Sequence, residues 1–198
     1  MVAPLIKRLF DPYIELDLRV WENFEKLGET CRFPKETILK EAHATEKYLT
    51  LLLEGSGGCL LWNRHNFVCT DLAQEQEFLC DFASFTTRSP TPVEIRLFED
   101  SRLFRVSHAA FQQTFLPGNF GDKVTKEVVQ VSYFDKQQQQ IDLLTKSAKE
   151  RYLELLGTRK GLDRIPLKYL ASYLGITPQS LSRIRAEKIG QLPYDKPE

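Results

Sequence analysis

Short polar and cationic side chains gather in the segment TPQSLSRIRAEK, residues 177–188. On a helix that begins here, they fall on one face, away from Leu181 and Ile184. Arginine can bind a guanine edge with two hydrogen bonds, glutamine can pair with adenine, and serine can hold a phosphate. The segment therefore predicts a helix that enters the major groove of DNA. The candidate contact residues are Thr177, Gln179, Ser180, Ser182, Arg183 and Lys188, with Lys168 further upstream.

The surrounding residues fit a helix-turn-helix frame that begins at Leu167. Such a frame needs a small residue where its helices cross and a glycine in its turn, and Ala171 and Gly175 stand at these places. Thr177 and Pro178 are suited to be the N-cap and the first residue of the second helix. The alternative, an ordinary helix pair with a polar outer face, is disfavoured by these matches and by the local positive charge. The five apolar places of the frame hold Leu170, Leu174, Ile176, Leu181 and Ile184.

The charge distribution indicates a nucleic-acid partner at this end of the chain. The 198 residues carry 27 Lys and Arg against 27 Asp and Glu. Residues 145–190 carry 10 basic and 4 acidic residues, whereas residues 1–144 carry 16 and 21. Such asymmetry is typical of contact with nucleic acid or a membrane. No stretch approaches the roughly 18 apolar residues of a membrane span, and the first thirty residues contain no export signal. We therefore expect a cytoplasmic protein without membrane contact.

The elements that must position this segment differ along the chain. Residues 12–28 show helical spacing of apolar residues, and Gly28 is expected to end that helix. Residues 33–110 form short runs rich in Thr, Val, Leu and Phe, separated by turn clusters such as TTRSPTP and EGSGG, of which the second is expected to be a hairpin turn. These runs predict an antiparallel sandwich or roll. Residues 148–156 predict a further helix that stops near Gly157.

Residues 117–145 predict one long helix that pairs with a second copy of the chain. A helix of about 25 residues spans roughly 37 Å, which is long for a small domain unless a partner covers it. Its apolar residues recur close to every 3.5 positions, with an interruption at Gln138. The candidate dimer seam consists of Val124, Val128, Val131, Phe134 and Ile141, followed by Leu144.

The order of these units resembles the Crp/Fnr family of transcription regulators, whose sensory domain is a cyclic-nucleotide-binding-like β-roll. FPKETILKEAHATEKYLTLLLEGSGG and FEDSRLFRVSHAAFQ are similar to the opening and the close of that roll. AKERYLELLGTRKGLDRIPLKYLASYLGITPQSLSRIR is similar to the DNA-binding end of a branch with a shortened C-terminus. The resemblance implies an α+β chain: an N-terminal antiparallel β-roll over 1–116, a dimerisation helix over 117–146 and a helix-turn-helix domain over 147–198. The family's β-hairpin wing does not fit in IGQLPYDKPE.

The stretch FLCDFASFTTRSPTPVEI departs from the family's phosphate cassette, which is Phe-Gly-Glu, a short helix and Arg-Ser/Ala. Cys80 and Asp81 stand in the Gly-Glu places, and Thr91 and Pro92 fall where Arg-Ser is expected. Without that glycine and arginine, a cyclic phosphate loses close backbone approach and its bidentate partner. Arg88 could substitute if the loop shifts. We expect a weak effector site at Cys80, Asp81, Arg88 and Thr91 that does not bind cyclic AMP tightly.

Other classes of protein lack their signatures. The chain shows no G-x-S-x-G elbow, Ser-His-Asp grouping or P-loop, and no His-x-His pair of a metal-dependent cupin, so we expect no enzyme, no metal and no cofactor. A haem ligand in the sensory domain is the alternative for the isolated histidines, and a metal or redox role is the alternative for the thiols. These residues are His43, His65 and His108, and Cys31, Cys59, Cys69 and Cys80.

Together these features predict a DNA-binding transcription regulator that acts as a homodimer on inverted repeats. A two-fold axis would place two reading helices about 34 Å apart, one turn of DNA. RNA polymerase is a further expected partner, and the effector is unknown. The alternative is an effector-binding or protein-interaction module that no longer binds DNA.

Overall fold

The computed structural model describes residues 1–64, 66–115 and 119–189, without the side chains at 114–115, 119–125, 127–128, 131 and 188–189. Within these ranges, antiparallel strands form two sheets, of order β1-β7-β3 and β2-β6-β4-β5. The predicted α+β class with an N-terminal antiparallel β-roll is confirmed. The strands are β1 (Gly28–Phe33), β2 (Ile38–Lys40), β3 (Tyr48–Glu54), β4 (Gly57–Asn63), β5 (Asn66–Ala73), β6 (Val93–Leu97) and β7 (Ser101–Ser107).

The turn EGSGG connects the two sheets. β3 pairs with β7, whereas β4 pairs with β5 and β6, so the prediction of a hairpin turn here is wrong. Leu51 and Leu52 are both fully buried, and they lie in different cores on the two faces of β3. Because β3 is buried on both faces, its sequence does not alternate between apolar and polar residues, and it therefore gives no indication of which strand pairs with it. Gly55 has φ +101°, and an added Cβ would collide with Ser101, so the crossover requires glycine.

Strand β5 carries one extra residue relative to β4. Cys59 lies opposite Asp71 and Leu60 lies opposite Cys69, which leaves Thr70 without a partner on β4. This arrangement is a β-bulge, which bends a strand and re-aims its side chains.

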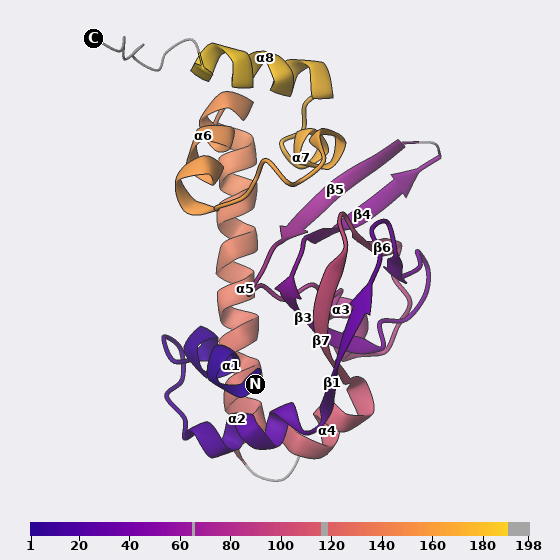
Figure 1. Cartoon of the computed structure of the whole chain (residues 1–198), viewed down its shortest axis with the longest axis vertical. Helices are drawn as coiled ribbons and strands as arrows, with labels where there is room; N and C mark the ends of the chain where they lie inside the picture. The colour runs from indigo at the N-terminus through magenta and orange to yellow at the C-terminus, as the bar shows by residue number, and fades with distance from the viewer. Residues whose placement is uncertain (65, 116–118, 190–198) are drawn as a thin grey trace, which may run out of the picture.

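Two short helices precede the roll, α1 (Ala3–Phe10) and α2 (Leu18–Glu25). The predicted helix within 12–28 is confirmed as α2, but it ends before Gly28, because Gly28 already pairs with Val106 in β1. Helix α1 was not predicted. The start of α1 is held by the Glu25 carboxylate, which accepts hydrogen bonds from the backbone N–H groups of Val2 at 2.7 Å and Ala3 at 2.9 Å. In Figure 1, α1 and α2 lie beside the lower part of the long helix α5 (Asn119–Thr145), and residues from all three helices line one pocket.

The predicted long helix is confirmed as α5, which has 27 residues (Asn119–Thr145). It runs beside the roll, from α1 and α2 at one end to α6 (Ala148–Thr158) at the other (Figure 1). α6 starts with a capping box in which Ser147 and Glu150 bond reciprocally, and it ends one residue after Gly157. The remaining helices are α3 (Phe82–Thr87), α4 (His108–Phe115), α6 (Ala148–Thr158), α7 (Leu167–Tyr173) and α8 (Pro178–Ile189). No helix among the described residues is long and apolar enough to span a membrane.

One apolar core joins the roll to the C-terminal helices. Its members from the roll pack directly against α7 and its neighbours, so the core crosses the boundary that the sequence places near residue 147. From the roll come Leu60, Cys69, Leu72 and Phe98, and from the C-terminal part come Tyr152, Leu162, Ile165, Tyr169, Leu170, Ala171, Leu174 and Leu181.

Candidate nucleic-acid interface

Helices α7 and α8 form the predicted helix-turn-helix pair. The frame's small residue and three of its apolar residues are at most 1% exposed, and Ile176 and Ile184 are half-buried. Gly175 has φ +68°, and an added Cβ would meet no atom within 4 Å. Glycine is therefore needed at this turn for its left-handed backbone and not for space. The buried members are Leu170, Ala171, Leu174 and Leu181.

The start of α8 follows the predicted capping. Pro178 is its first residue, and Thr177 Oγ1 accepts the N–H of Ser180 at 3.2 Å. The two hydroxyls of Thr177 and Ser180 also lie 3.0 Å apart. Two hydroxyl groups thus stand at a helix N-terminus, where backbone N–H groups and the helix dipole favour an anion such as a phosphate.

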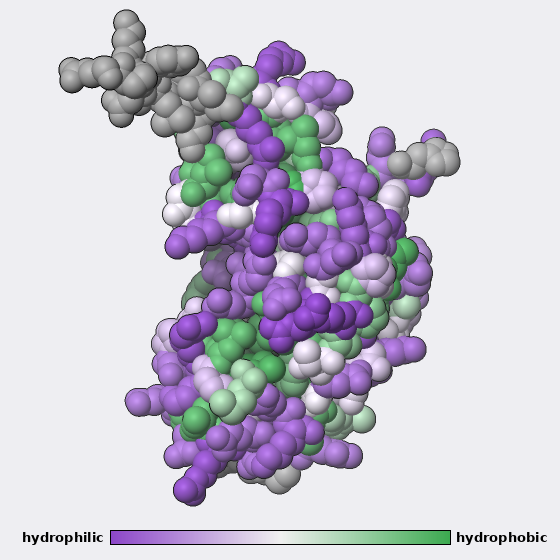
Figure 2. Space-filling view, viewed as in Figure 1, coloured by the Kyte–Doolittle hydropathy of each residue, from purple (hydrophilic) through white to green (hydrophobic). Residues whose placement is uncertain are grey.

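The candidate DNA-contact residues of α8 lie mostly on its free face. Gln179, Ser182 and Arg183 are exposed and Ser180 is half-buried. In Figure 2, the outer edge of the molecule where α8 lies is mostly hydrophilic. The side chain of Lys188 lies outside the described residues. The structure therefore gathers the predicted residues 177–183 on one short surface.

Lys168 lies apart from this surface, on the side of α7 that faces the roll. Its Nζ is 3.8 Å from Glu36 Oε1 and lies over the ring of Tyr169. Its side chain is nevertheless half exposed, so this long ion pair is weak.

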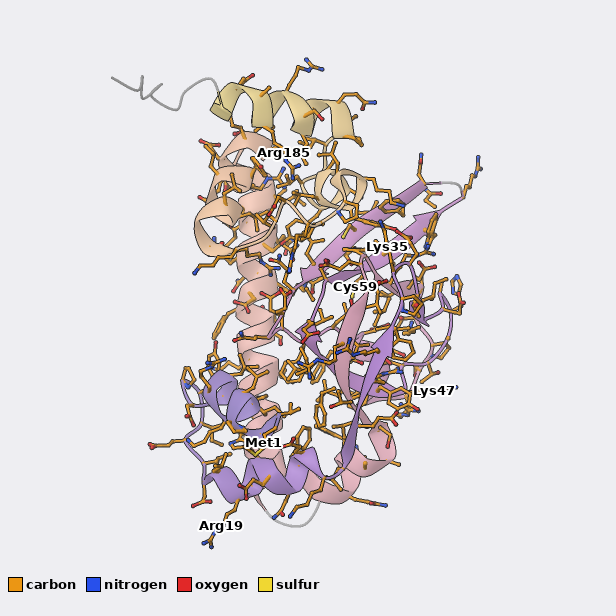
Figure 3. All side chains as sticks on the ribbon, viewed as in Figure 1. Met1, Arg19, Lys35, Lys47, Cys59 and Arg185 are labelled. Atoms are coloured by element: carbon orange, nitrogen blue, oxygen red, sulfur yellow. The ribbon has the colours of Figure 1, made fainter. Side chains whose placement is uncertain are left out.

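Inward-facing contacts fix α8 on α6. Arg185 points from α8 toward α6 (Figure 3), and its Nε donates to the hydroxyl of Tyr152 at 3.2 Å. Lys149 Nζ lies 2.7 Å from Glu187 Oε2, which links the same two helices. Arg183 and Arg185 are thus two residues apart but serve opposite sides of the helix, one exposed and one packed against the protein.

A second set of contacts fixes α7 on the roll. The ring of Tyr169 stacks on Phe98, with centroids 3.9 Å apart and planes 12° apart, and its hydroxyl donates to Glu36 Oε2 at 2.9 Å. The Ser172 hydroxyl accepts the N–H of Cys69 at 2.9 Å and donates to the carbonyl of Phe67 at 3.2 Å. Sequence reasoning missed this interface, because the helix-turn-helix frame sets no requirement at positions 169 and 172.

Two ion pairs link the roll to the segment that precedes α7. Arg164 donates to both carboxylate oxygens of Glu75 at 2.5 Å, and Arg159 lies 3.0 Å from Glu77. Burial acts to raise the pKa of Glu75, but the hydrogen bond from Arg164, hydrogen bonds from backbone N–H groups and the positive charge of Arg164 together outweigh it and hold that pKa below its usual value. Burial dominates at Glu77, whose pKa is raised.

In the stretch that corresponds to the family's phosphate cassette, the Asp81 carboxylate forms an ion pair and hydrogen bonds with other residues of the chain. Lys40 Nζ lies 3.2 Å from Asp81 Oδ2, and the Thr91 hydroxyl donates a short hydrogen bond to the same oxygen. Lys40 also donates to the carbonyl of Val93 at 2.6 Å, while Asp81 Oδ1 accepts the N–H of Ser84 and caps α3. Both charged side chains are at most 5% exposed. Asp81, which stands in the place of the family's glutamate, is therefore already paired with Lys40, a residue that the sequence did not indicate.

The other two predicted effector residues lie around this pair. The Cys80 thiol donates to the carbonyl of Tyr48 at 3.5 Å, and burial raises the pKa of the thiol well above its usual value. Arg88 ends α3 with φ +56°, and its Nη1 donates to the carbonyl of Glu46 at 2.6 Å. The structure thus brings Asp81 and Thr91 into direct contact and directs Arg88 to another partner. No group of three His, Cys, Asp or Glu side chains suited to a metal ion occurs among the described residues.

No family model and no curated protein matches the chain. Solved structures match nearly all of it. CLP of Xanthomonas campestris, a c-di-GMP responsive global regulator, superposes with a TM-score of 0.65 at 17% identity, over 88% of this chain and 92% of CLP. FixK2 of Bradyrhizobium japonicum gives 0.68 at 10% identity, over 86% and 89%. A structure from Eubacterium rectale, described as a transcriptional regulator of the Crp/Fnr family, gives 0.67 at 17% identity, over 89% and 86%.

The chain has the Crp/Fnr fold. The resemblance that the sequence indicated is therefore confirmed at the level of architecture, from the roll through the long helix to the helix-turn-helix. At 10–17% identity, no binding residue is carried over from these Crp/Fnr structures.

The Arg164–Glu75 ion pair should stabilise the contact between the roll and the C-terminal helices in a pH-dependent way. We expect a double-mutant cycle with Arg164→Met and Glu75→Gln to give a coupling energy of about 0.5–1 kcal/mol at neutral pH, measured by urea unfolding. Because the folded-state pKa of Glu75 is lowered, this coupling is present above the unfolded value of about 4.3 and is lost as pH falls through the folded pKa. A coupling that persists at pH 2, or that is absent at neutral pH, would contradict this assignment.

Proposed function

We propose that this chain is a Crp/Fnr-family transcription regulator that binds double-stranded DNA as a homodimer and acts in the cytoplasm. The observation that carries the proposal is the free polar face of α8, with Gln179, Ser182 and Arg183 exposed on a helix whose other side is buried. A helix of this kind, presented by a helix-turn-helix pair, is the usual reader of the major groove. The structural neighbours named as regulators support the same function.

Each candidate contact has a chemical role in this proposal. Arg183 is suited to a guanine edge and Gln179 to an adenine, because both reach from the first turns of α8. The hydroxyls of Thr177 and Ser180 are suited to a phosphate at the helix start. Ser182 and Lys188 follow on the same helix. Lys168 would reach a phosphate only by leaving Glu36, which the length of that ion pair makes inexpensive.

The apolar surface of α5 supports the dimer. Phe134 is 54% exposed and Ile141 is 45% exposed, although both are large apolar residues. Tyr133 and Leu144 extend the exposed apolar surface on the same side of the helix. Soluble monomers rarely leave such a row uncovered, and a second copy of α5 would bury it. The predicted seam residues Val124, Val128 and Val131 lie outside the described side chains.

The buried contacts among Lys40, Asp81 and Thr91 support the proposal that the protein does not bind cyclic AMP tightly. A cyclic phosphate would have to displace the Thr91 hydroxyl and compete with Asp81 for Lys40, in a buried site where unpaired charge is costly. Arg88, the remaining cation of the stretch, bonds the backbone of Glu46. The effector is unknown, and RNA polymerase is a proposed partner.

Arg183→Ala is expected to relax the base preference at one position of the binding site by about 1–3 kcal/mol, because it removes one reader. Selection of bound sites from random duplexes, followed by competition binding, measures this. Arg185→Ala is the matched control: its side chain packs on Tyr152, so it should leave the base preference unchanged. If the wild type captures no duplex even at low ionic strength, where phosphate contacts are strongest, the DNA-binding proposal fails and the protein-interaction alternative stands.

Phe134→Glu and Ile141→Glu should dissociate the dimer, because each places a charge in the apolar contact between two α5 helices. Sedimentation velocity at micromolar concentration measures the change from dimer to monomer. Ala109→Glu is the control, since it adds the same charge at an exposed position of α4, outside α5. A wild-type monomer under these conditions would contradict the proposed dimer.

Titration calorimetry with cyclic AMP and cyclic GMP is expected to show no binding in the micromolar range. The physical reason is that Lys40 and the Thr91 hydroxyl are already bonded to Asp81, so a phosphate would have to displace these buried contacts. Micromolar affinity for either nucleotide would overturn this part of the proposal.

A further inference from the structure

The turn between α7 and α8 is closed by two backbone hydrogen bonds. The N–H of Gly175 donates to the carbonyl of Ser172 at 3.0 Å, and the N–H of Ile176 donates to the carbonyl of Ala171 at 3.0 Å. With Gly175 in the left-handed conformation, these bonds form a Schellman motif, which commonly ends a helix. Neither bond uses the carbonyl of Leu174, the residue that lies directly between α7 and the turn.

Arg151 of α6 bonds this remaining carbonyl. Its Nη2 donates to Leu174 O at 2.9 Å. Leu174 is 1% exposed, so water has little access to its carbonyl, and a buried carbonyl without a donor is destabilising. The carbonyl also lies at the C-terminus of α7, where the unpaired carbonyls of a helix favour a cation. A guanidinium group meets both requirements.

The side chain of Arg151 is directed into the protein. Its Nε is buried and has no hydrogen-bond acceptor among the described residues. Arg151 is half-buried, whereas Arg183, the proposed reader of a base, is exposed. Arg151 is therefore placed to hold the turn and not to contact DNA.

The contacts of α6 reach both the turn and α8. Tyr152 and Lys149 contact α8 through Arg185 and Glu187, and Arg151 contacts the turn from which α8 starts. A binding element must be held within about 0.5 Å and 10–20° of its productive geometry. The bond from Arg151 acts at the start of α8, where a small rotation moves every side chain of the helix.

We propose that Arg151 is a positioning residue for base recognition, which fixes the direction of α8 by bonding the Leu174 carbonyl. The effect on DNA rests on the proposed function. Loss of the bond should weaken discrimination at all base positions that α8 reads, whereas loss of Arg183 relaxes one. It should leave the phosphate contacts, and hence the salt dependence of binding, unchanged.

The test replaces Arg151 by methionine, which removes the donors and keeps an unbranched apolar side chain. We expect the ratio of specific to non-specific duplex affinity to fall by about tenfold or more, since several base contacts are misaligned together. The slope of log affinity against log salt concentration should stay the same, because loss of a phosphate contact would change it by about 0.9. Selection from random duplexes shows whether all positions relax.

Two variants at other charges provide the comparison. Arg151→Lys keeps the charge and a donor for the carbonyl, so it should recover most of the affinity ratio. Lys160→Met removes the same charge at an exposed position of the segment before α7, so it should leave the ratio unchanged.

A third variant and a measurement without DNA separate positioning from general loss of stability. Ile95→Val weakens the core of the roll and should keep the affinity ratio. In the DNA-free chain, Arg151→Met should speed amide hydrogen exchange at Gly175 and Ile176 by about tenfold, and Lys160→Met should not. If Arg151→Met does not fold in thermal unfolding, Arg151→Gln, which also removes the charge, replaces it.

The outcomes are distinguishable from failure of the proposed function. If the wild type captures no duplex, that function fails, and hydrogen exchange alone decides whether Arg151 holds the turn. Unchanged exchange in the turn, an unchanged affinity ratio, a salt slope altered by about 0.9, or relaxation at a single base position would each overturn the positioning role. An equal loss of the ratio in Ile95→Val would also overturn it.

Discussion

The stacking of Tyr169 on Phe98 anchors the core that the roll shares with the C-terminal helices. α7 has only seven residues, and a helix of that length has little stability in water unless tertiary packing holds it. Here the packing comes from the roll on one side and from α8 on the other. An aromatic pair contributes about 0.5–1.5 kcal/mol beyond burial of its area, and Ser172 adds hydrogen bonds to the backbone of β5. The orientation of α8 therefore depends on the integrity of the roll.

The C-terminal helices could be predicted from the sequence because their constraints are local. A left-handed turn selects Gly175, a helix start selects Thr177 and Pro178, and each requirement falls within a few residues of the next. The long helix was predictable for a similar reason, since its apolar residues recur close to every 3.5 positions within one continuous segment. α1 carried no such signal, because its stability comes from Glu25 and from the aromatic cluster around Trp21, more than ten positions away.

The cassette shows where prediction from sequence stops. The resemblance placed Asp81 where the family has its glutamate and Thr91 where it has its phosphate-binding arginine, and the missing glycine and arginine indicated a weak site. Lys40 lies about forty positions earlier on a three-residue strand, and only the pairing of β2 with β6 brings it to Asp81. No local pattern marks a lysine as the partner of a distant buried carboxylate. The same holds for Glu36, which meets Tyr169 across the interface between roll and helices.

The bulge at Thr70 decides which way the end of β5 faces. Along a regular strand, side chains alternate, so residues 67, 69 and 71 would share one side. The extra residue reverses that phase, and Leu72 follows Phe67 and Cys69 into the core beneath α7. Asp71 is thereby turned toward Lys136 on α5. The single extra residue thus lets β5 direct Leu72 toward α7 and Asp71 toward α5. Deletion of Thr70 would exchange the directions in which these two side chains point.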